Sequence, residues 1–185
     1  MFIQTESTPN PATLKFLPGQ TVLAQGALEY RSVESAEGAP LAAALLSLPG
    51  VQSVMFGQDF VSVTKGEVDW AHLKPALLGI IMEHFTSQAP LLVGEAAPQG
   101  AGAEFFDPAD AEAVATIKEL IETRVRPAVA GDGGDIVFRG FKDGVVYLTM
   151  KGACSGCPSS SATLKNGIEN LLRHFLPQIR SVQQA

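Results

Sequence analysis

Cysteine is scarce in this 185-residue chain, which has two, at positions 154 and 157. One short disulfide between them would close a very small loop, so it could stabilise the fold only slightly. In a reducing compartment, a Cys-x-x-Cys pair is more typical of a metal-binding or redox-active site than of a structural disulfide.

Positive charge and long apolar runs are scarce as well. Thirteen Lys and Arg residues against nineteen Asp and Glu give a formal net charge of -6. A nucleic-acid-binding protein normally has a basic patch or a high pI, so we expect no nucleic-acid partner. The longest apolar runs, 41–48 and 77–82, fall far short of the ~20 residues of a membrane span, so we expect no membrane partner.

The N-terminal residues lack the patterns of targeting segments. Residues 1–6 show neither the basic start and apolar stretch of a secretory signal nor the Arg- and Ser-rich composition of a transit peptide. We therefore expect a cytoplasmic protein, or a mitochondrial one if the chain is a processed form.

A Pro- and Gly-interrupted, Ala-rich stretch lies at residues 90–105. This composition and its weak periodicity are typical of a flexible linker. It divides the chain into 1–89 and 106–185, and each part is long enough for a small domain.

Residues 1–89 alternate between strand-like and helix-like patterns, which predicts an α+β domain. The expected strands are 2–5, 13–17, 28–33, 51–56 and 60–64, and the expected helices are 40–48 and 70–85.

Residues 106–185 predict a second α+β domain with the order helix, β-hairpin, Cys-x-x-Cys loop, helix. Asp107 and Pro108 suit the start of the first helix, and Pro127 is expected to end it. The remaining expected elements are strands 136–141 and 145–150 around a turn at 142–144, a helix from Pro158 to about Pro177, and a closing strand at 179–182.

The cysteines lie among small residues at 152–156, which let the backbone wrap closely around a bulky group. Pro158 fits the first turn of the following helix. We therefore expect both sulfurs to lie near a helix N-terminus, where the helix dipole lowers the thiol pKa and favours thiolate.

Counting ligands makes the cysteine pair half of a site. Structural zinc and iron–sulfur clusters normally take four protein ligands. His72 and His84 belong to the first domain, and His174 lies roughly 25 Å further along the second helix. Two chains that each give two cysteines would complete the set, which predicts a metal or cluster that bridges a dimer.

Other polar groups in this domain are more simply explained by turns and helix ends. Asp132 and Asp135 flank two glycines, and we expect a tight turn in which Asp caps backbone N–H groups. The serines at 159–161 are expected to be helix-start hydroxyls, because no histidine nearby in sequence could activate them.

Several segments resemble one protein family. Residues 126–135 (RPAVAGDGGD), 152–160 (GACSGCPSS) and 163–169 (TLKNGIE) resemble the C-terminal domain of NifU-like iron–sulfur scaffold proteins. Residues 5–11 (TESTPNP) and 14–19 (LKFLPG) resemble the Nfu-type N-terminal domain. Together the two resemblances cover nearly the whole chain except the linker.

The resemblance implies a carrier, not an enzyme. It implies that Cys154 and Cys157 bind a [4Fe–4S] cluster shared between two protomers, which is then delivered to apo-proteins. A shared [2Fe–2S] cluster is not excluded by two cysteines per chain. We further expect the N-terminal domain to select partners, either recipient apo-proteins or upstream cluster assembly factors.

Two other functions fit a Cys-x-x-Cys pair. A thiol–disulfide oxidoreductase would form a reversible intramolecular disulfide without iron. A zinc-bridged interaction module would hold stoichiometric zinc and show no visible absorption.

Overall fold

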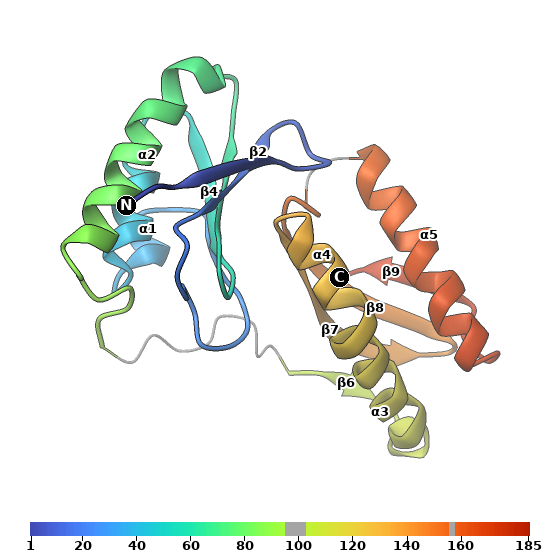
Figure 1. Ribbon diagram of the computed structural model, residues 1–185. Coiled ribbons are helices and arrows are strands. Elements are labelled where there is room, and N and C mark those ends of the chain that lie inside the picture. Colours follow the sequence, from blue (N-terminus) through green and yellow to red (C-terminus); the bar gives the residue numbers. More distant parts are fainter. Residues whose placement is uncertain (95–102, 156–157) are drawn as a thin grey trace. The chain divides into compact units, whose positions relative to one another are not determined.

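The computed structural model describes residues 1–94, 103–155 and 158–185, and it divides the chain into two compact units, Met1–Gln99 and Gly100–Ala185 (Figure 1). Each unit contains helices and a β-sheet, so the predicted α+β class is confirmed. Each unit has a hydrophobic core of its own and is described separately.

The first unit is built on an antiparallel sheet with the strand order β1-β2-β5-β4-β3. The strands are β1 Gln4–Ser7, β2 Thr13–Leu17, β3 Leu28–Tyr30, β4 Val51–Phe56 and β5 Val61–Lys65. The five strands expected from alternation are all present, with ends that differ by a few residues, because period-2 patterning is a local property of the sequence.

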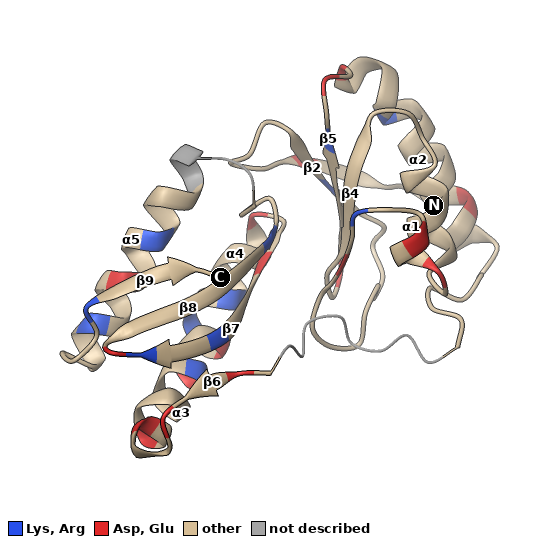
Figure 2. Cartoon of the chain, turned by 180° about the vertical axis from the view of Figure 1, so that it is seen from behind, with Lys and Arg blue, Asp and Glu red and all other residues tan. Residues whose placement is uncertain are grey.

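Two helices, α1 (Pro40–Leu46) and α2 (Trp70–Thr86), lie on the same side of this sheet in both views (Figures 1 and 2). A short 3-10 helix, Glu34–Ala36, precedes α1. The core between the helices and the sheet contains fully buried Leu45, Leu77 and Phe56. Burial of such side chains away from water is the main force that holds the two layers together.

The second unit has a four-stranded mixed sheet with the order β6-β7-β8-β9. Its strands are β6 Phe105–Phe106, β7 Gly134–Lys142, β8 Val145–Gly152 and β9 Ser181–Gln184. β7 and β8 are antiparallel, whereas β6 and β9 each add in parallel at the edges. The two-residue strand β6 was not predicted, because it is too short for an alternating pattern.

The helices of this unit pack on one face of the sheet. They are α3 Ala111–Leu120, a π-helical segment Ile121–Val125, α4 Arg126–Gly131 and α5 Pro158–Phe175, with a 3-10 turn at Pro108–Asp110. Ile117, Ile136 and Leu172 from three elements meet in one core at 0% exposure. In Figure 2 the strands β7–β9 lie in front of these helices.

The prediction that Pro127 ends the first helix of this unit was wrong. The helical path continues to Gly131, and Pro127 lies in the first turn of α4. The N–H of Arg126 donates to the carbonyl of Ile121, five residues back, so the chain makes a wider π turn there. A first-turn proline needs no N–H partner, which is why the helix can restart at this point.

The β7–β8 hairpin turns through two residues, Asp143 and Gly144, whose φ angles are 52° and 79°. Positive φ at both positions is typical of a type I′ turn, which matches the twist of the strands. Beyond the predicted strand ends, the pairing continues until Gly134 lies opposite Gly152. This extension brings the start of β7 beside the loop that carries the cysteines.

Among the described residues, no helix has the length and apolar character that crossing a membrane would require.

We expect the stability of the first unit to depend on His84 in weakly acidic solution. His84 lies on the buried stripe of α2, and its Nε2 has no hydrogen-bond partner among the described residues. Burial lowers its pKa, so below about pH 6.5 the unfolded chain binds a proton that the folded chain does not. Stability should therefore fall as the pH falls from 6.5, and His84→Leu should flatten this dependence.

Urea denaturation followed between pH 5 and pH 8 measures the effect. His72→Gln, on the exposed part of the same helix, is the control and should leave the pH dependence in place. An unchanged slope in His84→Leu would contradict the assignment.

Candidate functional site

The cysteine loop joins β8 to α5 in the second unit. α5 begins at Pro158, as predicted. Cys154 is described by the structure, whereas Cys157 lies outside the described residues. The prediction for the Cys157 sulfur is therefore not tested, and the geometry below is that of Cys154.

Cys154 lies inside the hydrophobic core of its unit, with 6% of its surface exposed. Its sulfur packs against the Cα of Gly134, because a Cβ at position 134 would lie 2.4 Å from Cys154 Sγ. The main chain holds this position: the N–H of Ala153 donates to the carbonyl of Gly133 at 3.2 Å. The N–H of Ser155 donates to the carbonyl of Gly152, which closes a turn around Cys154.

The expectation that the helix start lowers the pKa of both thiols was wrong for Cys154. Burial, and to a smaller extent the negative charges of Asp132 and Asp135, raise the pKa of Cys154 to about 12. Both effects disfavour the thiolate, because an anion is costly in an apolar core and beside other anions. The sequence indicated the helix that follows, but it did not indicate that the loop turns this sulfur inward.

Asp135 forms a bidentate ion pair with Arg126. Arg126 Nε and Nη2 donate to Oδ1 and Oδ2 of Asp135 at 2.8 and 3.0 Å, and Nη1 donates to Glu122 at 2.6 Å. Both carboxylate oxygens of Asp135 thus accept from the Arg126 side chain, and the expectation that an Asp of this turn caps backbone N–H groups stays a prediction. The hydrogen bonds to Asp135 raise the pKa of Arg126 above its ordinary value, because they favour the guanidinium.

Sequence reasoning missed this ion pair as a feature of the site. Arg126 lies on a helix and Asp135 lies on a strand, nine residues apart. Neither helical nor strand periodicity relates two such positions in the sequence. Both residues fall within the segment that resembles the NifU-like domain, which was the one available signal.

The histidines do not join Cys154. His174 is exposed in the last turn of α5, and its ring contacts Phe175. Within the described part of the chain, no group of three or more His, Cys, Asp or Glu side chains could hold a metal ion. The thiol of Cys154 is a suitable donor type for iron, but the described residues of one chain do not make a complete site.

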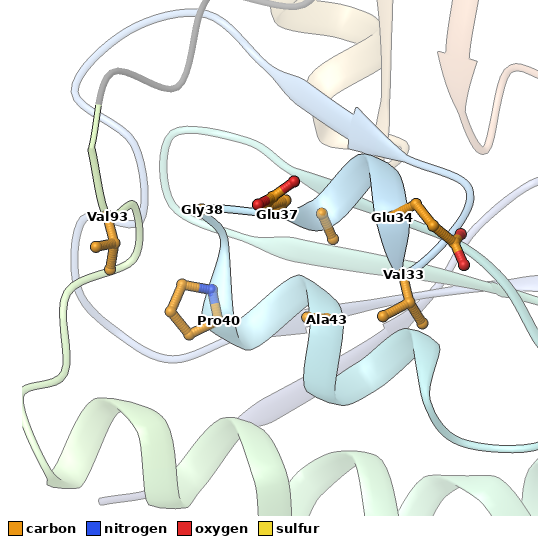
Figure 3. A pocket seen from close by; sticks show the side chains of 8 residues that line it. Val33, Glu34, Glu37, Gly38, Pro40, Ala43 and Val93 are labelled. Carbon is orange, nitrogen blue, oxygen red and sulfur yellow. The ribbon is translucent and has the colours of Figure 1, made fainter.

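A second candidate surface is a pocket of about 790 Å³ in the first unit (Figure 3). Its lining consists of Val33, Glu34, Ala36, Glu37, Gly38, Pro40, Ala43 and Val93. Val93 lies over the entrance to α1, where its N–H donates to the carbonyl of Gly38 at 2.7 Å. Among the described residues, the lining thus combines apolar side chains with two carboxylates and includes no Lys, Arg or His.

Comparison with known proteins matches both units. A family model described as "Scaffold protein Nfu/NifU N terminal" matches residues 3–88, and one described as "NifU-like domain" matches residues 117–183. The human protein named "NFU1 iron-sulfur cluster scaffold homolog, mitochondrial" is 47% identical over 186 residues, which cover 100% of this chain and 72% of that one. The chain belongs to the Nfu/NifU family of scaffold proteins.

Other family members are similarly close. "NifU-like protein 4, mitochondrial" from Arabidopsis thaliana is 49% identical over all of this chain and 66% of its own length. A Drosophila ananassae relative that shares the human protein's name is 48% identical, with 64% of its length covered. The chain thus spans about two thirds of the length of these relatives.

We expect loss of Arg126 to destabilise the second unit by leaving the Asp135 carboxylate buried without its partner. Breaking a fully buried pair costs about 3–5 kcal/mol, and Arg126 is partly exposed, so Arg126→Met should cost roughly 2–3 kcal/mol. Arg126→Met with Asp135→Asn should recover more than half of this loss, because no unpaired charge remains.

Urea denaturation of the single and double variants measures the difference. Glu122→Gln is the control: this partner is exposed, and its loss should cost less than about 1 kcal/mol. Equal destabilisation of the single and double variants would show that the ion pair is not responsible.

Proposed function

We propose that the chain is an iron–sulfur cluster carrier that holds a [4Fe–4S] cluster as cargo between two protomers and passes it to apo-proteins. In this proposal the ligands are Cys154 and Cys157 of each protomer, and the protein is not an enzyme. The observation that carries it is the Cys-x-x-Cys loop between β8 and α5, in a chain that belongs to a scaffold family whose human member is named for iron–sulfur clusters.

The shared site follows from the number of ligands. The chain has two cysteines, and a cluster normally takes four thiolates. A second protomer supplies the missing pair, so cargo binding favours the dimer by mass action. A cluster at the seam between two chains is held by few contacts, and it can leave when a recipient offers competing thiolates.

Binding of iron must also replace the proton of Cys154. Metal ligands bind in their deprotonated form, and the high pKa of this thiol means that it carries its proton at neutral pH. Cargo loading therefore releases a proton from each Cys154, and return of the proton accompanies cargo release.

The redox alternative receives less support than the carrier. The attacking thiol of a disulfide oxidoreductase has a lowered pKa and partial exposure, whereas Cys154 is buried and its pKa is raised to about 12. Zinc in a dimer seam would use the same four thiols. Iron and sulfide analysis of anaerobically prepared protein, together with its visible spectrum, distinguishes the cluster from zinc.

We expect Cys157→Ala to abolish retention of the cluster, because two chains would then offer two thiolates in place of four. After anaerobic reconstitution and desalting, iron, sulfide and the brown absorption should be lost, and sedimentation velocity should show no cluster-dependent dimer. His174→Ala is the control: it removes the one histidine in the sequence of this unit and should leave cluster retention unchanged. A Cys157→Ala protein that stays brown would refute the ligand assignment.

We propose that the first unit selects partners and that the pocket at the start of α1 is its contact surface. The apolar walls of Val33, Pro40 and Val93 favour an apolar side chain, and Glu34 and Glu37 favour a neighbouring cation. The proposed occupant is a segment of a recipient or assembly protein in which a Lys or Arg flanks an apolar residue. This proposal assigns a role to the unit that contributes no cysteine.

We expect Glu34→Lys with Glu37→Lys to slow cluster transfer to recipients that use this pocket, because the new charges repel the cation. Transfer from loaded protein to an apo [4Fe–4S] protein measures the rate, and cluster retention by the carrier should not change. Asp59→Lys with Glu67→Lys, at exposed positions of the same unit, alters the net charge equally and is the control. Equal slowing in both double variants would argue against a specific pocket.

The location of the protein stays a prediction. We expected a cytoplasmic protein, or a mitochondrial one if the chain is processed. The names of the relatives include the word mitochondrial, which favours a mitochondrial location.

A further inference from the structure

The start of β7 forms a close-fitting surface for Cys154. A Cβ at Gly134 would lie 2.4 Å from Cys154 Sγ, 3.0 Å from the carbonyl oxygen of Lys151 and 3.1 Å from the amide nitrogen of Cys154. Cβ atoms essentially never approach another heavy atom as closely as 2.4 Å, and the two main-chain contacts are tighter than nine in ten real Cβ contacts. Position 134 must therefore lack a side chain for Cys154 to lie where it does. We call this surface, formed by Gly134 with the main chain of Gly133 and Lys151, the cysteine seat.

The main chain on both sides of Cys154 fixes it in the seat. Ala153 donates to the carbonyl of Gly133, which joins the loop to the turn before β7. Gly152 has a φ of 61°, a conformation in which glycine is favoured, and this bend directs the chain inward from the end of β8. The seated sulfur contributes to the same core as Ile136 and Met150.

A seated sulfur cannot bind a cluster shared with a second chain. Such a cluster lies at the surface of each protomer, whereas Cys154 is 94% removed from solvent and surrounded by its own unit. We infer that Gly134 is a positioning residue that holds Cys154 in a closed seat in the cargo-free chain, and that cargo loading requires Cys154 to leave this seat. The inference rests on the proposed function in one respect, the assignment of Cys154 as a cluster ligand.

The first experiment measures access to Cys154 in the cargo-free, full-length chain. In a Cys157→Ser background Cys154 is the only thiol, so its alkylation by iodoacetamide under native conditions reports the open seat. Adding Gly134→Ala should increase the alkylation rate roughly tenfold or more, because the methyl group and the sulfur cannot occupy the same space. An alkylation rate within about twofold of the background would overturn the inference.

Gly140→Ala is the control, because it also introduces a clash in the same strand, but away from the loop. A Cβ at Gly140 would lie 2.5 Å from the ring of Phe105. If Gly140→Ala increases the alkylation rate as much as Gly134→Ala does, general weakening of β7 explains the effect and the seat has no special role.

A second measurement keeps the inference testable if Gly134→Ala fails to fold. In the Cys157→Ser chain with Gly134 intact, the alkylation rate is measured in urea below the unfolding transition. Local opening of the loop exposes little surface, so the rate should change only slightly with urea. A rate that rises as steeply as the global unfolding equilibrium would overturn the inference, because Cys154 would then leave its seat only when the unit unfolds.

Reconstitution of the chain with both cysteines separates this inference from the proposed function. If the unaltered chain retains iron and sulfide but Gly134→Ala does not increase Cys154 access, the seat is refuted and the carrier function stands. If Gly134→Ala increases access to Cys154 but the unaltered chain binds no cluster, the carrier function is refuted. The inference that cargo loading requires Cys154 to leave its seat is then refuted as well.

Discussion

The pairing of Gly134 with Gly152 at the open end of the β7–β8 hairpin is the constraint on which the candidate site depends. It brings the end of α4, the start of β7 and the end of β8 to one place, although they are separated by up to twenty residues in sequence. Because neither partner has a side chain, the loop after β8 can fold back over β7 and place Cys154 in the core.

The electrostatics of the site follow from the same placement. The cation beside Asp135 is Arg126, and its guanidinium donates hydrogen bonds to the carboxylates of Asp135 and Glu122. Burial is the largest cause of the high pKa of Cys154, and the two aspartates add to it. A buried, protonated thiol is a poor nucleophile and reacts slowly with oxidants. The fold thus protects one proposed ligand while no cargo is bound.

Much of the fold could be predicted from the sequence, because strand alternation, helix caps and turn residues are local signals. The Asp143–Gly144 turn, the start of α5 at Pro158 and the strands of the first unit were found in this way. The Cys-x-x-Cys spacing likewise identified the candidate ligands. The continuation of the helix past Pro127 could not be predicted, because the π turn depends on how the helix packs.

The environment of Cys154 also could not be predicted, for a related reason. Whether a sulfur near a helix start faces solvent or the core depends on the register of the hairpin before it. No short sequence pattern encodes that register over nine residues of β7 and eight of β8. The ion pair between Arg126 and Asp135 arises from the same long-range packing, so it too became visible only in three dimensions.

The cysteine seat also bears on how a carrier can both hold and release its cargo. A ligand that loses its cluster normally becomes an exposed thiolate, and that cost opposes release. In the proposed carrier, Cys154 can regain its proton and return to an apolar seat that excludes water. The free energy of closing offsets part of the lost iron–sulfur bonding, because any process that favours the cargo-free state weakens cargo binding by the same amount. A side chain at position 134 would remove this contribution, so under this proposal the glycine at the start of β7 favours cargo release as well as protection of the thiol.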